Sequence, residues 1–449
     1  MTAIVSSLGA PLVPRIALDH GVDLPTAQLT LIATLVVGAV ANPLLGRWGA
    51  GPRRRAALLA GLAVVAAGCA LAALPLGFGW LLAGRALQGV GLALNPLAFA
   101  EARARTPSVR AARVVALLAA INVAGGGLGY VVTGLVARWG GVAACFVVGL
   151  VLTVLAWTLV ALVVDEEPGP NDVGQVDWWG AAELGTGCAL LLVLLNLGGA
   201  WGWATVPSLC CLAAGCVLVA AWWRRSLRVR RPLVDLRLAV APGTLVIHLT
   251  ALTVGTGMYV VMTTLVMMVQ APAETGYGLG RSVVVAGALL VPYAAGSVLG
   301  SRLLVLLGGR LTAAGTLGAG CLVLVAGACL LGLRHGTVAD LYVGFGVVGL
   351  GSGCTFAAMP GLLVLAVPRG ETSSAIAFNL VLRYLGFAAG SALCVALLRA
   401  LSGGGDITAG AVEGTLWAAA GIWLLAWAGT AASGLGRRLA GGRSRRTVL

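Results

Sequence analysis

The chain carries little charge for its length. Only 10% of its 449 residues are Asp, Glu, Lys or Arg, and lysine is absent altogether. Because a soluble domain has roughly 25% charged residues, this composition excludes a core surrounded on all sides by water. With 59% hydrophobic residues and a mean hydropathy of +1.00, most of the chain must lie in lipid.

Motifs for soluble chemistry are missing as well. No G-x-x-x-x-G-K-[ST] loop occurs, so ATP is not expected to drive the protein directly, and there is no H-E-x-x-H pattern. The ten cysteines form no C-x-x-C pair and all fall in apolar runs, where they are expected to be small packing residues. His20, His248 and His335 are too far apart in the topology for an obvious metal site. We expect neither enzymatic activity nor a cofactor nor a metal.

The net charge of +14 comes from arginine alone. In a soluble protein such a charge would suggest a nucleic-acid partner. Here the arginines cluster in short segments between apolar runs, as the positive-inside rule requires, so no nucleic-acid partner is expected. The clusters follow every second run, which predicts a multi-pass protein of the cell (plasma or inner) membrane with both termini in the cytoplasm.

Apolar runs of about 20 residues, enough to cross ~30 Å of hydrocarbon, recur along the chain. Thirteen complete spans are predicted, over residues 28–46, 56–75, 79–100, 114–137, 141–164, 179–198, 204–223, 244–270, 283–307, 312–333, 338–366, 376–399 and 411–434. The opening stretch, residues 2–17, is apolar but short, and we expect it to be the end of a first helix whose beginning is missing. The predicted total is about 14 spans.

Two longer segments between spans divide the chain. Residues 165–178 are acidic and residues 224–243 are basic, with two spans between them. The predicted domains are an N-terminal six-helix bundle (1–164), a two-helix insertion with flanking segments (165–243), a C-terminal six-helix bundle (244–434) and a basic cytoplasmic tail (435–449).

An internal repeat links the two predicted bundles. Residues 84–100 align without a gap on residues 344–360, and three glycines match: Gly84, Gly89 and Gly91 on Gly344, Gly349 and Gly351. Both segments occupy the fourth helix of their bundle. Duplication of one ancestral half is therefore plausible, because repeat-built transporters show such symmetry.

Three local motifs lie in the N-terminal half. Span four contains Arg85-Ala86-Leu87-Gln88-Gly89-Val90-Gly91, the segment after span two reads Gly46-Arg47-Trp48-Gly49-Ala50-Gly51-Pro52-Arg53-Arg54-Arg55, and span five contains Gly125, Gly129 and Gly134. With the layout of six, two and six spans, these motifs resemble the major facilitator superfamily, in particular its fourteen-helix drug/proton antiporter branch. The resemblance implies an all-α membrane protein with the major facilitator fold, two six-helix bundles plus two extra transmembrane helices, and alternating access by rocking of the two halves.

An arginine inside a membrane helix is costly, by ~2.5–3.5 kcal/mol. Arg85 therefore needs a partner or a water-filled cavity. The resemblance implies that Arg85, with Gln88 beside it, takes part in proton transfer or substrate binding. The alternative is that Arg85 extends to the nearby outer interface.

The other two motifs are incomplete. In Gly46 to Arg55, the glycines and the arginines Arg53 and Arg54 remain, but the acidic residue expected near Ala50 is absent. In the family that acid latches the outward-open state, so here the latch should be weaker or built differently, unless the segment is only a basic anchor. Gly125, Gly129 and Gly134 resemble the antiporter motif without its proline and are expected to form a sliding helix contact.

Further polar residues lie inside predicted spans. Asn379 and Arg383 are four apart, on one helix face, and Arg383 lies too deep for an interface residue. The candidate substrate-binding or coupling residues are Arg85, Gln88, Asn95, Asn122, Tyr259, Thr263, Tyr293, Asn379 and Arg383. Each polar residue alone is more often a helix-packing group than a ligand contact.

No carboxylate falls at mid-membrane depth, where proton-coupled export normally needs one. A cavity with two arginines and no acid would suit neutral or anionic solutes rather than organic cations. The predicted function is secondary transport, with proton-coupled efflux of a small hydrophobic or amphiphilic compound as the first choice. The alternatives are uptake, transport of neutral or anionic solutes without classical proton antiport, or a non-transporting membrane protein. The expected partners are a small-molecule substrate, protons and the lipid bilayer, and the expected state is a monomer.

Overall fold

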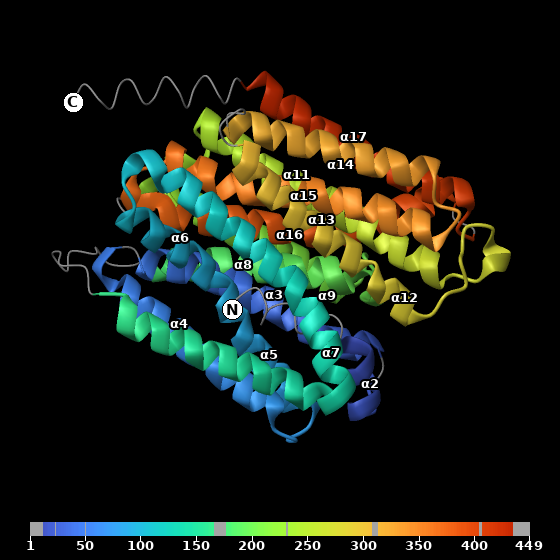
Figure 1. Ribbon diagram of the computed structural model, residues 1–449, viewed down its shortest axis with the longest axis horizontal. Helices are drawn as coiled ribbons and strands as arrows, with labels where there is room; N and C mark the ends of the chain where they lie inside the picture. The colour runs from blue at the N-terminus through green and yellow to red at the C-terminus, as the bar shows by residue number, and fades with distance from the viewer. Residues whose placement is uncertain are drawn as a thin grey trace. The chain divides into compact units, whose positions relative to one another are not determined.

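The computed structural model describes residues 12–22, 24–49, 51–165, 177–229, 232–307, 313–403 and 406–433. Every regular element in these ranges is a helix, and no strand is present among them (Figure 1). The prediction of an all-α chain is confirmed for this part. Most of the opening stretch, most of the acidic segment before residue 177 and the basic tail lie outside the described residues.

Ten helices of the described part are long and apolar enough to cross a membrane. Two other predicted spans are interrupted. Residues 79–100 fall on α5, a short 3₁₀ segment and α6, and residues 283–307 fall on α12 and α13. The multi-pass character is thus supported, whereas the total of about 14 remains a prediction.

The chain divides into two compact units. Unit 1 comprises residues 1–107, 128–239 and 367–381, and unit 2 comprises residues 108–127, 240–366 and 382–449. The helices of unit 1 are α2 (Val13–His20), α3 (Leu24–Trp48), α4 (Arg54–Ala73), α5 (Phe78–Gln88), α6 (Leu94–Arg105), α8 (Trp178–Trp201), α9 (Val206–Arg228) and α10 (Leu236–Ala239). Those of unit 2 are α11 (Pro242–Gln270), α12 (Val283–Ala288), α13 (Leu290–Leu307), α14 (Ala313–Leu333), α15 (Val338–Ala366) and α17 (Ala409–Ala432). Helices α7 (Ser108–Val163) and α16 (Thr372–Leu401) contribute to both units.

Glycines break two of these helical paths. Gly141 has φ of 70° and divides α7 into two helices, because only glycine adopts this left-handed region without strain. Gly89 and Gly91 lie in the 3₁₀ helix η3 (Gly89–Ala93), between α5 and α6. A tighter 3₁₀ turn inside a helical run often marks a strained or functional position, and this one directly follows Arg85 and Gln88.

In unit 1, the glycines of the repeat bring helices into backbone contact. A methyl group added at Gly84 would lie 2.7 Å from the carbonyl oxygen of Gly68 on α4. One at Gly89 would overlap the carbonyl oxygen of Thr34 on α3, and one at Gly91 would meet Val65 on α4. The segment is thus seated between α3 and α4.

The matching glycines of unit 2 pack in the same order. A methyl group at Gly344 would overlap Leu331 on α14, one at Gly349 would overlap the carbonyl of Tyr293 on α13, and one at Gly351 would press on Leu324 of α14. In both units, then, the first and third glycines face the preceding helix and the second faces the helix before that. The repeat found in the sequence is also a repeat of packing.

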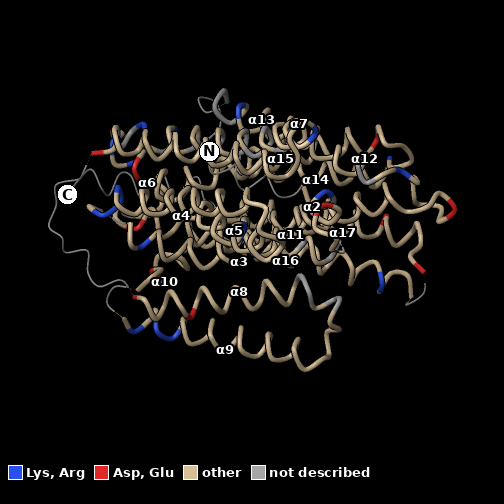
Figure 2. The backbone as a smooth tube through the Cα atoms, turned by 90° about the horizontal axis from the view of Figure 1, so that it is seen from below, with Lys and Arg blue, Asp and Glu red and all other residues tan. Residues whose placement is uncertain are grey.

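The predicted insertion belongs to unit 1. Helices α8 and α9 lie side by side, with charged residues gathered mainly at one end (Figure 2). There Asp177 accepts a hydrogen bond from the backbone N–H of Gly180 and pairs with Arg225 at 2.8 Å. The Trp222 ring lies 5.9 Å from the ring of Phe378, near the start of α16. The insertion therefore packs against the first turns of α16, within the same unit.

Candidate functional site

Arg85 is completely buried inside unit 1. Its Nη1 donates a hydrogen bond to Oε1 of Gln88 at 2.6 Å, and its guanidinium lies 5.9 Å from the centre of the Phe146 ring. Its Nε and Nη2 have no hydrogen-bond partner, and no described carboxylate forms an ion pair with it. The structure therefore places Arg85 in the interior rather than at an interface, with donors left over for a further acceptor.

The surroundings of Arg85 are fixed by short-range packing. The Nε2 of Gln88 reaches the carbonyl of Gly68 at 3.4 Å, and the hydroxyl of Thr34 donates to the carbonyl of Arg85 at 3.0 Å. Both contacts depend on the glycines that draw α4 and α3 against α5. A buried guanidinium with unsatisfied N–H groups is costly, so an anion or a carbonyl oxygen bound there would be strongly favoured.

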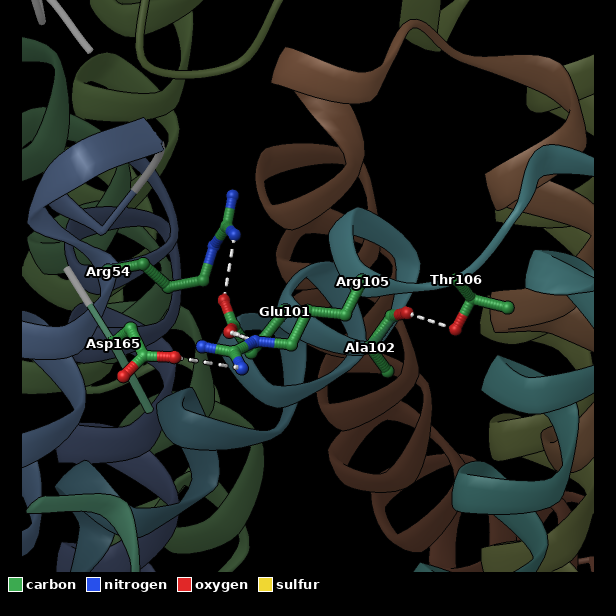
Figure 3. A network of polar contacts seen from close by, with 6 residues as sticks. All are labelled: Arg54, Glu101, Ala102, Arg105, Thr106 and Asp165. Carbon is green, nitrogen blue, oxygen red and sulfur yellow. Dashed lines mark hydrogen bonds and ion pairs between the residues drawn. The ribbon is translucent and has the colours of Figure 1, made fainter. Parts of the chain in front are cut away.

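A second polar network lies at the end of α6. Figure 3 shows Glu101 between Arg54 and Arg105, with Asp165 on the far side of Arg105. Glu101 accepts a hydrogen bond from Arg54 at 2.9 Å and another from Arg105, which also lies 3.6 Å from Asp165. Burial raises the pKa of Glu101, but the hydrogen bonds and positive charges of the two arginines outweigh it, so the pKa lies below its ordinary value.

The motif that starts at Gly46 meets the segment before α16. Arg47 pairs with Glu371 at 2.8 Å, across 324 positions of sequence. A methyl group at Gly46 would lie 3.1 Å from the Cβ of Ala377, so this glycine lets the two helices approach. Arg53 is exposed and takes no part.

Arg103 closes the same contact from α6. Its guanidinium donates to the carbonyls of Val367, at 3.0 Å, and Pro368, at 3.3 Å, and to the hydroxyl of Thr372. No acid is present near Ala50, but Glu371, directly before α16, supplies an acidic partner for Arg47 of this motif. The sequence predicts a latch that is weaker or built differently, or only a basic anchor. This arrangement is a candidate for a latch built differently, and its role stays a proposal.

The glycines of the third motif lie in α7. Gly129 is buried and its carbonyl accepts a hydrogen bond from Thr133 at 2.6 Å. Gly134 is exposed, and a methyl group there would meet no atom within 4 Å. Gly125 is half-buried. The sliding contact expected of Gly125, Gly129 and Gly134 remains a prediction.

In unit 2, Arg383 lies among aromatic rings. Its guanidinium is 4.6 Å from the centre of the Phe356 ring on α15 and 5.8 Å from that of Tyr384. Its Nε is buried without a hydrogen-bond partner, and no described acid pairs with it. Asn379, one turn earlier in α16, is buried. A cation over an aromatic face gains ~0.5–2 kcal/mol, depending on how far it is removed from water, which contributes to the tolerance of this half-buried arginine.

The remaining candidates differ in how far the protein itself satisfies them. The Tyr293 hydroxyl accepts a hydrogen bond from Ser352 at 2.9 Å and contacts the Met258 sulfur at 3.2 Å. Tyr259 stacks on Phe387 with ring centres 4.7 Å apart. The half-buried residues are Asn95 on α6, Asn122 on α7, and Tyr259 and Thr263 on α11. Tyr293 is thus the weakest candidate for a free ligand contact.

Reasoning from the sequence missed four contributors: Arg103, Glu371, Phe356 and Phe387. Arg103 and Glu371 lie between predicted spans, where charged residues are common. The aromatic pair could have been noticed, because the chain has only seven phenylalanines and Phe387 falls one helical turn after Arg383. Among the described residues, no group of three or more His, Cys, Asp or Glu residues could hold a metal ion.

Comparison with known proteins identifies the fold. A family model described as "Major Facilitator Superfamily" matches residues 1–391. The chain belongs to this superfamily. The resemblance noted in the sequence is thus confirmed at the level of the superfamily. Assignment to the fourteen-helix antiporter branch is not confirmed.

The individual relatives of this superfamily member are distant. It is 27% identical over 247 residues to the "Uridine/deoxyuridine transporter" of Lactococcus lactis subsp. cremoris, and the match covers 54% of the chain and about half (51%) of that relative. The human organic anion transporter MFSD10 (TETRAN) has a TM-score of 0.66 at 16% identity, covering 96% of each chain. The proton:xylose symporter XylE, bound to 6-bromo-6-deoxy-D-glucose, has a TM-score of 0.63 at 15% identity, covering 95% of this chain and 91% of XylE. At such identities the two structures share the fold alone.

Proposed function

We propose that this superfamily member carries a small neutral or anionic organic solute by alternating access, and that each unit offers one arginine for acceptor groups of such a solute, Arg85 in unit 1 and Arg383 in unit 2. The observation that carries the proposal is the state of Arg85. It is completely buried, and among the described residues its Nε and Nη2 have no hydrogen-bond partner and no carboxylate neutralises it. A lipophilic cation would be repelled by such a group, whereas a carbonyl or a carboxylate would satisfy it.

The names of the similar proteins agree with this substrate class. One relative is described as a transporter of uridine and deoxyuridine, and one structural neighbour as an organic anion transporter. The other neighbour is a proton:xylose symporter. None of these solutes is cationic. This agreement supports the proposal without assigning any of the three substrates to the present chain.

Proton-coupled export of a hydrophobic or amphiphilic compound is the second candidate function. It is favoured by the likeness of Gly125, Gly129 and Gly134 to the antiporter motif. The proposal further includes a cell-membrane location with both termini in the cytoplasm, which the arginine distribution supports, and a monomeric state. The experiment that identifies the substrate also tests whether protons drive transport.

Reconstitution into liposomes tests both candidates. Uptake of labelled uridine, benzoate, xylose and tetraphenylphosphonium would be measured with and without a proton gradient, with a pH-sensitive dye inside the vesicles. We expect transport of a neutral or anionic solute, reduced at least tenfold by Arg85→Gln and little changed by Arg399→Gln, since Arg399 is an exposed arginine of α16. Transport of tetraphenylphosphonium alone, with proton movement in the opposite direction, would favour the second candidate and refute the first.

A further inference from the structure

The aromatic rings near Arg383 form a continuous set. Phe387 lies one turn beyond Arg383 on α16 and stacks on Tyr259 of α11, with ring centres 4.7 Å apart and planes inclined by 24°. It also meets Phe356 edge to face, at 6.2 Å and 71°. Phe356 in turn lies under the guanidinium of Arg383, at 4.6 Å. One cation and three rings from three helices therefore share one place in unit 2.

Direct backbone contact between α11 and α16 holds this set in position. A methyl group at Gly255 would lie 2.8 Å from the carbonyl oxygen of Arg383. One at Gly386 would overlap the carbonyl of Leu252, and one at Gly390 would overlap that of Thr256. These contacts place Tyr259 beside Phe387 without any bound ligand. A site formed in advance lowers the cost of binding.

The set is not closed off by its own contacts. Tyr259, Arg383 and Phe387 are each only half-buried, and the buried Nε of Arg383 has no acceptor. Another aromatic stack in the same unit behaves differently. The ring of Tyr293 stacks on Phe345 at 4.9 Å and 27°, almost the same geometry. There, however, Phe345 is 1% exposed and the tyrosine hydroxyl is bonded to Ser352.

We propose that Tyr259, Phe356, Phe387 and Arg383 bind a planar aromatic ring that carries an oxygen acceptor at its edge, either a carboxylate or a ring carbonyl. The ring of the substrate packs against the half-buried faces of Tyr259 and Phe387, and its acceptor oxygen meets the guanidinium of Arg383. Aromatic faces recognise planarity, and the guanidinium adds a charge-assisted hydrogen bond. This assignment rests on the proposed transport function and narrows its substrate class.

Paired probes separate planarity from charge and size. Equilibrium binding to the purified full-length chain in detergent would be measured for 2-naphthoate against decahydro-2-naphthoate, and for uridine against 5,6-dihydrouridine. Preference within the first pair indicates an aryl carboxylate, and preference within the second a ring carbonyl. We expect the planar member of at least one pair to bind more tightly than its saturated partner. The variant Phe387→Leu should weaken the planar member about two- to tenfold and leave the saturated one unchanged.

Two control variants test whether the effects are specific to the proposed site. Phe345→Leu removes a ring from the other stack and should not alter the preference for planar probes. Arg383→Gln should weaken the planar probe, whereas Arg399→Gln should not. A melting curve for each variant identifies any loss of binding that reflects unfolding, and Tyr259→Leu serves as a second variant if Phe387→Leu does not fold.

Two results would overturn the assignment. One is equal binding of both members in both pairs by the unaltered chain. The other is an undiminished preference for planar probes in Phe387→Leu and Tyr259→Leu. If one of these results is obtained while the protein still transports a solute into liposomes, the aromatic site is refuted and the proposed transport function is not. If the unaltered chain transports none of the solutes tested, the proposed function itself is refuted.

Discussion

Residues 84–100 and residues 344–360 pack on corresponding neighbours but differ in chemistry. Gly84, Gly89 and Gly91 face α4, α3 and α4, and their counterparts face α14, α13 and α14. At the position of Arg85 the second segment has Phe345, which is almost fully buried and stacked on Tyr293. The difference shows that the glycines set the helix spacing independently of what the remaining positions carry.

The contrast continues beyond the aligned segments. With the same offset, Glu101, Arg103 and Arg105 correspond to Gly361, Leu363 and Leu365. Glu101 binds Arg54, Arg103 binds the segment at residues 367–372, and Arg105 lies close to Asp165. Leu363, in contrast, is an apolar side chain that is fully buried. Unit 1 therefore has charged residues at position 85 and at residues 101–105, whereas the corresponding positions of unit 2, 345 and 361–365, are apolar.

The largest expected effect comes from breaking what the two segments share. Gly89→Leu and Gly349→Leu should each lower the free energy of unfolding by about 3 kcal/mol or more, since the new side chain would overlap a backbone carbonyl that cannot move aside. Gly134→Leu and Gly421→Leu should be near neutral, because nothing lies within 4 Å of either position. Thermal unfolding in detergent measures all four, and equal losses would refute the packing argument.

The second test exchanges the chemistry. The double variant Arg85→Phe with Gln88→Val gives unit 1 the residues of its counterpart, and we expect it to fold but to lose transport at least tenfold. Removing both polar groups together avoids leaving Gln88 without its partner. The reverse change, Phe345→Arg, should destabilise by ~2.5–3.5 kcal/mol, the cost of an arginine at membrane depth. Full transport by the double variant would show that Arg85 is only structural.

A smaller effect is expected at the contact between Arg47 and Glu371. Both side chains are partly exposed, at 14% and 26%, and such pairs contribute about 0.2–1 kcal/mol. Arg47→Glu and Glu371→Arg should each lower the melting temperature, and the two together should recover part of the loss. A double-mutant cycle gives the coupling energy, and strictly additive losses would mean that the pair contributes nothing.

The smallest effect concerns pH. Because the pKa of Glu101 is lowered in the folded chain, its pairing with Arg54 and Arg105 stabilises the fold above the unfolded pKa of about 4.3. That contribution is lost as the pH falls through the lowered, folded-state value. The stability difference between the unaltered chain and Glu101→Gln should therefore be larger at pH 7 than at pH 3.5. A difference that stays constant with pH would show that the carboxylate charge is immaterial.

Much of the fold could be predicted because lipid leaves few alternatives. The apolar runs, the arginine clusters and the glycine repeat are local patterns, and the ten long apolar helices of the described part fall on predicted spans. The interruptions within residues 79–100 and 283–307 were not predicted. Arg85 and Gln88 could be paired in advance because they are three residues apart on one helix. Phe356 could not be placed beside Arg383, nor Glu371 beside Arg47, because those contacts depend on how helices cross, which a local pattern does not specify.

Helix α16 has a thermodynamic consequence. Its first turns are held by Arg103, by the Arg47–Glu371 pair beside them and by Trp222 of the insertion, and a few turns later the same rod carries Arg383 and Phe387. If ligand occupancy at Arg383 changes the strength of the grip on residues 367–378, then loosening that grip must change ligand affinity by the same factor. Probe affinity measured in Arg47→Gln, a position that touches no proposed ligand, would therefore test whether this coupling exists.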